Sequence, residues 1–269
     1  LLSRRQRQMC IRDSCVNEAQ SRRPYTRWAS PAFPDNYVSE VFRLADRHFP
    51  LAKLLYNDDR HWWNLHGEST PVFLLVRDLM RQGIRIGGLG LQFHLFEDLL
   101  HGEHEKFLNP KVLYACLDLY EKLGIPVNFS EVSVISRRDL GNGDEFQRLV
   151  TERLYRIWFS HPAVEGITWW NLVDGTASGS TLGGEDGENS LRAGLVNYDF
   201  SSKPAFEILK QLIHKEWHTE TVLQYEAGAI NAFHGFYGRY DAEIRTDFGT
   251  FFKEIVLSRN GMNQTSIRV

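Results

Sequence analysis

The sequence predicts an α/β fold in which short strands alternate with amphipathic helices around a parallel sheet. Two observations carry this prediction. Short apolar runs recur between residues 15 and 215, and nearly every one leads into a segment with apolar residues at helical spacing. The composition, 42% hydrophobic and 24% charged over 269 residues, is typical of a globular protein and argues against disorder and coiled coil.

Five segments are interpreted as strands: 15–17, 52–57, 84–91, 125–132 and 164–171. A complete eight-stranded βα barrel needs about 250 residues, so five βα units in this length fit either part of such a barrel or an open sheet.

The helices follow from apolar periodicity and from their end signals. Two of them begin with an N-cap residue and a proline, Thr70 with Pro71 and Asn109 with Pro110. The apolar faces of the five expected helices lie within residues 38–45, 72–79, 113–120, 146–157 and 205–212.

The two ends of the chain differ from this alternating region. Residues 1–14 carry Arg and Gln clusters without apolar periodicity, and we interpret them as an artefactual or disordered leader. Residues 216–269 contain alternating strands near 220–225, 239–245 and 250–257, separated by glycine turns, and predict a small β-rich appendage. The expected organisation is therefore 1–14, 15–215 and 216–269.

Charge and motif content narrow the class of partner. The net charge is -3, from 31 basic and 34 acidic residues, so no field of one sign favours nucleic acid or an anionic membrane. Cys10, Cys15 and Cys116 form no CxxC pair, and P-loop, GxGxxG and HExxH motifs are absent from the sequence. We therefore expect no cofactor, no metal and no membrane span, and a neutral partner.

Two glutamates stand where barrel enzymes place their chemistry. Glu18 and Glu131 each lie at the carboxyl end of an expected strand, which in barrels is the active-site face. Two carboxyl groups that flank a glycosidic bond can act as general acid/base and as nucleophile. Position alone favours solvated loop charges over a catalytic pair.

The sequence around these glutamates resolves that ambiguity by resemblance. Six landmarks follow one another in the order found in glycoside hydrolase family 10, the endo-1,4-β-xylanases. They are Val16-Asn17-Glu18-Ala19, Leu55-Tyr56-Asn57-Asp58, Gly88-Leu89-Gly90-Leu91-Gln92-Phe93-His94-Leu95, Phe129-Ser130-Glu131, Ile167-Thr168-Trp169-Trp170 with Asp174, and Gly194-Leu195 with Lys203-Pro204-Ala205. The resemblance implies a partial TIM (β/α)8 barrel containing strands 4 to 8.

The resemblance also implies an activity and a set of roles. The expected reaction is retaining hydrolysis of internal β-1,4-xylosidic bonds in xylan or xylo-oligosaccharides. Glu18 is expected to be the general acid/base and Glu131 the nucleophile, supported by Asn17 as donor to a sugar 2-hydroxyl, by His94 as partner of the nucleophile and by Gln92.

Substrate binding is expected at Trp170, Asn57, Trp62 and Trp63, and each has a structural alternative. Trp170 could plug the barrel instead of stacking on sugar, an Asx turn would explain Asn57, and Trp62 or Trp63 could pack in a core.

The chain departs from the family pattern in two ways. Ser133 stands where the family usually has Asp, which removes a charge next to the nucleophile and the histidine. The family's first three βα units precede the matching region, so we expect an incomplete fragment with open sheet edges, in which activity is doubtful. The intact parent is expected to be a secreted or cell-surface monomer, with its signal region not present in this chain.

Two other functions remain open on the sequence. One is a non-catalytic glycan-binding relative of the family, for which Ser133 is the internal support. The other is a glycosidase of the same barrel clan that acts on β-glucan, against which the Gln92 and His94 pattern argues.

Overall fold

The structure is a computed structural model that describes residues 12–21, 34–59, 67–96, 108–136, 143–224, 228, 230–259, 261 and 263. The chain divides into two compact units, Leu1–Glu207 and Ile208–Val269. Within the described residues, no helix is both long and apolar enough to cross a membrane.

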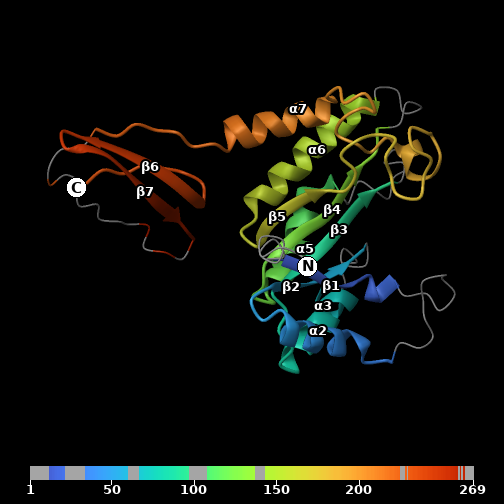
Figure 1. Ribbon diagram of the computed structural model, residues 1–269. Coiled ribbons are helices and arrows are strands. Elements are labelled where there is room, and N and C mark those ends of the chain that lie inside the picture. Colours follow the sequence, from blue (N-terminus) through green and yellow to red (C-terminus); the bar gives the residue numbers. More distant parts are fainter. Residues whose placement is uncertain are drawn as a thin grey trace. The chain divides into compact units, whose positions relative to one another are not determined.

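The first unit is built on a five-stranded sheet in which neighbouring strands are all parallel (Figure 1). The strands stand in sequence order, so each βα connection steps to the next position, and β1 and β5 form the two edges of the described sheet. The strands are β1 (Arg12–Asn17), β2 (Lys53–Asp58), β3 (Gly88–Leu95), β4 (Val127–Val134) and β5 (Val164–Trp169).

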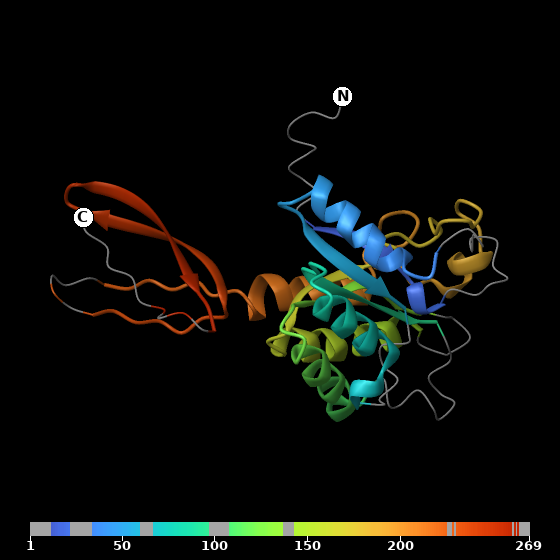
Figure 2. The ribbon, with the colours of Figure 1, turned by 90° about the horizontal axis from the view of Figure 1, so that it is seen from below.

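The helices lie between the strands, as the periodicity predicts. Right-handed crossovers that all step in one direction place their helices on one face of a sheet, and α2 packs against β1 and β2 (Figures 1 and 2). The α-helices are α2 (Tyr37–His48), α3 (Pro71–Arg81), α5 (Pro110–Glu121), α6 (Gly143–Ser160) and α7 (Pro204–Gln211). The short helical turns are η1 (Ala19–Ser21), η3 (Gly67–Ser69), η5 (Gly187–Leu191) and the π turn η6 (Leu212–Glu216).

The two expected proline-led helix starts both form, but their caps differ. The Asn109 side chain accepts a hydrogen bond from the backbone N–H of Lys111 at 3.0 Å, which is a true N-cap. The Thr70 hydroxyl instead donates to the carbonyl of Gly67 at 2.8 Å. The residue pattern therefore located both starts, but only Asn109 caps its helix through the side chain.

The core lies between the sheet and its helices. On β3, the side chains of Leu89, Leu91 and Phe93 are fully buried. The ring of Trp158 on α6 stacks on Phe129 with 4.0 Å between ring centroids, and meets Phe93 edge-on at 5.0 Å. Since side chains alternate along a strand, the residues between these apolar ones face the opposite side of the sheet, where the functional groups lie.

All five strands differ somewhat in extent from the sequence expectation, β3 and β1 most; β4 runs to Val134, so Glu131 lies within this strand and not at its last residues. The strand expected at 84–91 runs from Gly88 to Leu95, because Ile84 and Ile86 are buried without taking part in the strand. Strand β1 begins at Arg12, which pairs with Lys53, so it takes in three residues of the expected leader. Apolar residues in a sequence indicate which side chains are buried. The first and last residues of a strand depend instead on where a neighbouring backbone is available for pairing.

Among its described residues, the second unit contains an antiparallel hairpin of β6 (Gly238–Thr246) and β7 (Gly249–Leu257). The strand expected near residues 220–225 is wrong, because residues 218–224 have no regular structure. The alternating apolar pattern of this segment was therefore not enough for it to pair with another strand.

Candidate active site

The sheet face opposite the helices carries a row of polar side chains at the carboxyl ends of its strands. Strand pairing aligns Asn17 with Asn57, Gln92 with Glu131, and His94 with Ser133. These residues come from four adjacent strands. Because the strands are parallel, their carboxyl ends all lie at the same end of the sheet. The structure thus gathers the catalytic and support residues expected from the sequence into one cluster.

Glu18 directly follows β1 in an unusual backbone conformation. Its φ of 54° lies in the left-handed region, which non-glycine residues rarely adopt. Its backbone N–H donates to the carbonyl of Asn57 at 3.0 Å, and its Oε1 accepts from Gln92 Nε2 at 2.9 Å and from Asn17 Nδ2 at 3.3 Å. These bonds hold the carboxyl group over the end of the sheet despite the strained backbone.

Asn17 lies between the two glutamates and is oriented by two donors. Its Oδ1 accepts from Asn57 Nδ2 at 2.7 Å and from Gln92 Nε2 at 3.0 Å. Because both donors point at this oxygen, the amide nitrogen of Asn17 is turned to the other side, toward Glu18.

Glu131 accepts one hydrogen bond on each carboxyl oxygen. Asn57 Nδ2 lies 2.9 Å from Oε1, and His94 Nε2 lies 3.3 Å from Oε2. The side chain of Glu131 is 15% exposed. An ionised carboxylate only accepts hydrogen bonds, so the amide donor of Asn57 matches the charged form that a nucleophile requires. Asn17, Gln92 and Asn57 link Glu18 to Glu131 in one hydrogen-bonded network.

Trp170 forms an aromatic wall next to this network. Its ring meets His94 edge-on, with 5.8 Å between ring centroids, and its Nε1 donates to Glu188 Oε2 at 3.2 Å. Asn171 Nδ2 donates to the same oxygen at 3.3 Å. Trp170 is 44% exposed, which leaves ring surface for a sugar and does not fit a barrel plug. Trp169 instead donates to the carbonyl of Ala193 at 2.9 Å and contacts the Tyr155 ring, as a packing residue does.

The remaining expected substrate-binding residues have different outcomes. The amide of Asn57 contacts Asn17 and Glu131, so an Asx turn is not needed to explain this residue. Trp62 and Trp63 lie outside the described residues.

Three residues at the site were not expected from the sequence. They are Gly90, which lies beside Asn57; Ser130, whose hydroxyl donates to Asn57 Oδ1; and Glu188, which binds the Trp170 indole. A signal existed for Gly90, because it shares the strand parity of Gln92 and His94. Glu188 lies in the loop after β5 and carries no local signal.

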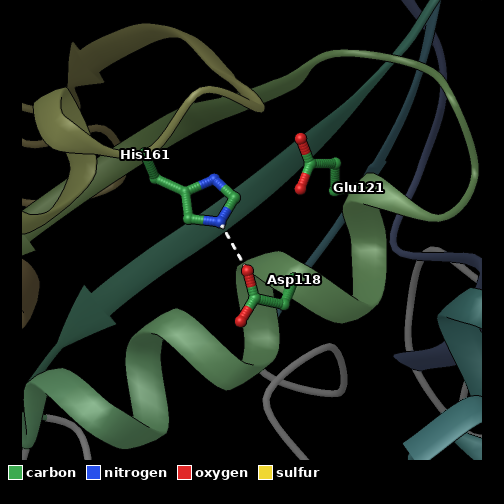
Figure 3. A group of neighbouring side chains, drawn as sticks. All are labelled: Asp118, Glu121 and His161. Carbon is green, nitrogen blue, oxygen red and sulfur yellow. Dashed lines mark hydrogen bonds and ion pairs between the residues drawn. The ribbon is translucent and has the colours of Figure 1, made fainter.

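A second cluster of possible ligands, Asp118, Glu121 and His161, lies on α5 and the turn after α6 (Figure 3). His161 Nδ1 accepts the backbone N–H of Ala163 at 3.2 Å, so the ring proton stands on Nε2, which faces Asp118 Oδ1 at 3.2 Å. A metal would need the lone pair of Nε2, which this tautomer does not offer. The buried His161 therefore links the turn after α6 to α5 through hydrogen bonds.

Known proteins are similar to this chain over most of its length. The model of glycosyl hydrolase family 10 matches residues 3–212, beginning within the expected leader. Endo-1,4-beta-xylanases 2 and 3 of Arabidopsis thaliana are 26% and 28% identical over 82% and 81% of this chain. The chain spans only 18% and 26% of their lengths.

Solved structures give the same fold. Native xylanase 10B from Thermotoga maritima superposes with a TM-score of 0.60 at 22% identity, covering 76% of this chain and 60% of that chain. Xylanase 10B from Thermotoga petrophila RKU-1 in complex with xylobiose gives 0.57 at 20% identity, over 77% of this chain and 60% of that chain. The five parallel βα units are thus part of a (β/α)8 barrel, and the chain belongs to glycosyl hydrolase family 10.

Proposed function

We propose that this chain carries the catalytic pair of a retaining endo-1,4-β-xylanase, with Glu18 as general acid/base and Glu131 as nucleophile. The observation that supports this most directly is the network that joins the two carboxyl groups through Asn17, Gln92 and Asn57. It lies at the carboxyl ends of the strands, where barrel enzymes bind substrate.

The proposed reaction proceeds in two displacements. Protonated Glu18 gives its proton to the glycosidic oxygen while Glu131 attacks the anomeric carbon, so the C–O bond to the leaving sugar breaks and a glycosyl ester forms. Glu18, now ionised, takes a proton from water, which attacks the same carbon and releases Glu131. Two inversions at one carbon give net retention.

Asn17 is suited to stabilise the charge that develops in this reaction. Its orientation by two donors aims its amide nitrogen at the region of Glu18, and the residue is exposed. A hydrogen bond to the sugar 2-hydroxyl strengthens as the ring becomes oxocarbenium-like, so a fixed donor favours the transition state over the ground state.

Xylan is the proposed substrate because several lines of support converge on it. Relatives from several organisms bear the name endo-1,4-beta-xylanase, and structures of similar fold are complexes with xylobiose and xylotriose. The exposed Trp170 ring supplies an uncharged stacking surface for such a neutral sugar.

The test is hydrolysis of xylan, cellulose and mixed-linkage β-glucan by the full chain, beside Glu18→Ala and Glu131→Ala. The proposal requires xylan turnover, with loss of most activity in both variants, and NMR of the first product should show the β-anomer. Turnover that survives Glu131→Ala would refute the nucleophile, an α-anomer would refute retention, and preference for a glucan would refute the substrate.

A second candidate is glycan binding without turnover. It is favoured by Ser133, which stands where the family usually has Asp. One relative, from Acetivibrio thermocellus and 26% identical over 75% of this chain, bears the non-hydrolase name anti-sigma-I factor RsgI6. Calorimetry with xylohexaose separates the two: binding without products would support this candidate, whereas product release would exclude it.

A further inference from the structure

The ring of His94 is held at both nitrogens by residues of one neighbouring strand. Nε2 lies 3.3 Å from Glu131 Oε2, and Nδ1 lies 3.0 Å from Ser133 Oγ. Glu131 and Ser133 are two positions apart on β4, so their side chains face the same side of the sheet. The side chains of His94 and Glu131 are 17% and 15% exposed, and Ser133 is buried.

The chemistry of these partners determines where the ring proton lies. A carboxylate only accepts, so the nitrogen facing Glu131 carries a proton. A hydroxyl can donate or accept, but a buried one needs an acceptor for its own proton. Within the described part of the chain, His94 Nδ1 is the only partner recorded for the Ser133 hydroxyl. If Nδ1 were protonated, that hydroxyl proton would face no acceptor.

We infer that His94 is the neutral Nε2–H tautomer, and that Ser133 is the positioning residue that holds it so by donating to Nδ1. The remaining neighbours agree with a neutral ring. Phe96 stacks on it at 4.8 Å and Trp170 meets its edge, and neither carries a charge. Among the described residues, Glu131 is the ionisable group that contacts the His94 ring. Glu188 accepts a hydrogen bond from the indole of Trp170, and it is Trp170 that contacts the His94 ring.

The catalytic meaning of this tautomer rests on the proposed role of Glu131 as nucleophile. A neutral imidazole orients the carboxylate through one hydrogen bond and leaves its negative charge undiminished. An imidazolium would instead pair with that charge and weaken the attack on carbon. Where the family's usual Asp would place a negative charge beside Nδ1 of His94, Ser133 places a neutral hydrogen bond.

The test is long-range 15N–1H NMR of the full chain labelled with 15N-histidine, with His94→Asn to assign the signal. At neutral pH, His94 is expected to show a protonated Nε2 and an unprotonated Nδ1. Ser133→Thr, which keeps the hydroxyl, should preserve this pattern. Ser133→Ala removes the donor to Nδ1 but leaves the Glu131 carboxylate facing Nε2, so its Nδ1 signal should shift toward that of a protonated nitrogen while Nε2 stays protonated. In Ser133→Asp, the added carboxylate should make the imidazolium persist to higher pH.

A doubly protonated or Nδ1–H ring in the unsubstituted protein would overturn the inference, as would a Ser133→Ala spectrum identical to it. The unsubstituted spectrum decides even if a variant fails to fold. The spectrum also needs no substrate, so the two proposals fail separately. An inactive protein with the expected tautomer would refute the hydrolase, and an active one with an imidazolium would refute the role of Ser133.

Discussion

The amide nitrogen of Asn57 on β2 lies 2.9 Å from Oε1 of Glu131 on β4, although β3 stands between these strands. The β3 residue that pairs with Asn57 is Gly90. A Cβ atom at position 90 would collide with Asn57 Oδ1 and lie 3.2 Å from Ser130 Cβ. The absence of a side chain at Gly90 is therefore what lets the carboxamide reach across the middle strand.

Gly90→Ala is expected to impair catalysis by displacing Asn57 from Glu131. A hydrogen bond to a charged group contributes about 1.5–3 kcal/mol, which corresponds to a fall in kcat of about 10- to 150-fold. Steady-state kinetics on xylohexaose measure this effect, with circular dichroism to show that the fold is kept.

The double variant Gly90→Ala/Asn57→Ala provides the control. If Gly90 acts through Asn57, the glycine substitution should add little once the carboxamide is gone, and the two free-energy changes should not sum. Full additivity would show that Gly90 acts by another route.

Tyr56→Phe is expected to destabilise the fold through Asp58. Both residues are fully buried, and the Tyr56 hydroxyl donates to Asp58 Oδ2. Burial raises the pKa of the Asp58 carboxyl, while this hydrogen bond and the N–H of Asp59 act in the opposite direction. Loss of the donor should cost about 1.5–3 kcal/mol of unfolding free energy at pH 7, measured by urea denaturation.

The pH dependence has a defined sign. Because the folded-state pKa of Asp58 is raised, the folded protein binds more protons than the unfolded chain above pH 3.8. The contribution of this group to stability therefore falls as pH rises from the unfolded pKa to the folded one. Tyr56→Phe raises the folded pKa further and should extend that fall to higher pH. Tyr155→Phe is the matched control, since its hydroxyl has no hydrogen-bond partner within the described residues; an equal effect there would exclude the Asp58 mechanism.

Lys203→Met tests the buried ion pair that ties the loop after β5 to the start of α7. Lys203 Nζ donates to Asp174 Oδ2 at 3.2 Å and to the carbonyl of Arg192 at 2.7 Å, and its side chain is fully buried. Its removal leaves the buried Asp174 carboxylate with the longer ion pair to Arg192, at 3.6 Å, and the N–H of Gly194, and should cost up to about 3–5 kcal/mol in urea unfolding.

The exposed pair of Lys122 and Glu68, 3.2 Å apart, supplies the contrast. Lys122→Met should change stability by at most about 1 kcal/mol, because solvent screens an exposed pair. Similar losses in the two variants would mean that the buried pair contributes no more than a surface one.

Glu188→Ala is expected to weaken substrate binding by freeing the Trp170 indole. The lost bond to Nε1 should raise KM by up to about tenfold with little change in kcat. Glu188→Gln keeps an acceptor oxygen and should restore most of the affinity. A fall in kcat without a change in KM would place Glu188 in the chemical step instead.

Local pattern in the sequence was sufficient for the elements and for the residue types at the site. Alternating apolar runs and proline-led helix starts located all five βα units, because burial periodicity and capping act over a few neighbouring residues. The same short sequence motifs placed Asn17, Glu18, His94 and Glu131 at or near the carboxyl ends of expected strands. In a parallel sheet these ends all lie at the same end of the sheet.

The tertiary structure alone decided how these residues work together. Asn57 and Glu131 are 74 residues apart, and their hydrogen bond depends on the strand register and on the space above Gly90. The limits of β3, the tie between Tyr56 and Asp58, and the hold of Glu188 on Trp170 likewise depend on which backbone or side chain lies across from them. Sequence by itself determined which groups reach the edge of the sheet. Only the packed strands determined which donor meets which acceptor, because hydrogen bonds need distances and directions that periodicity does not contain.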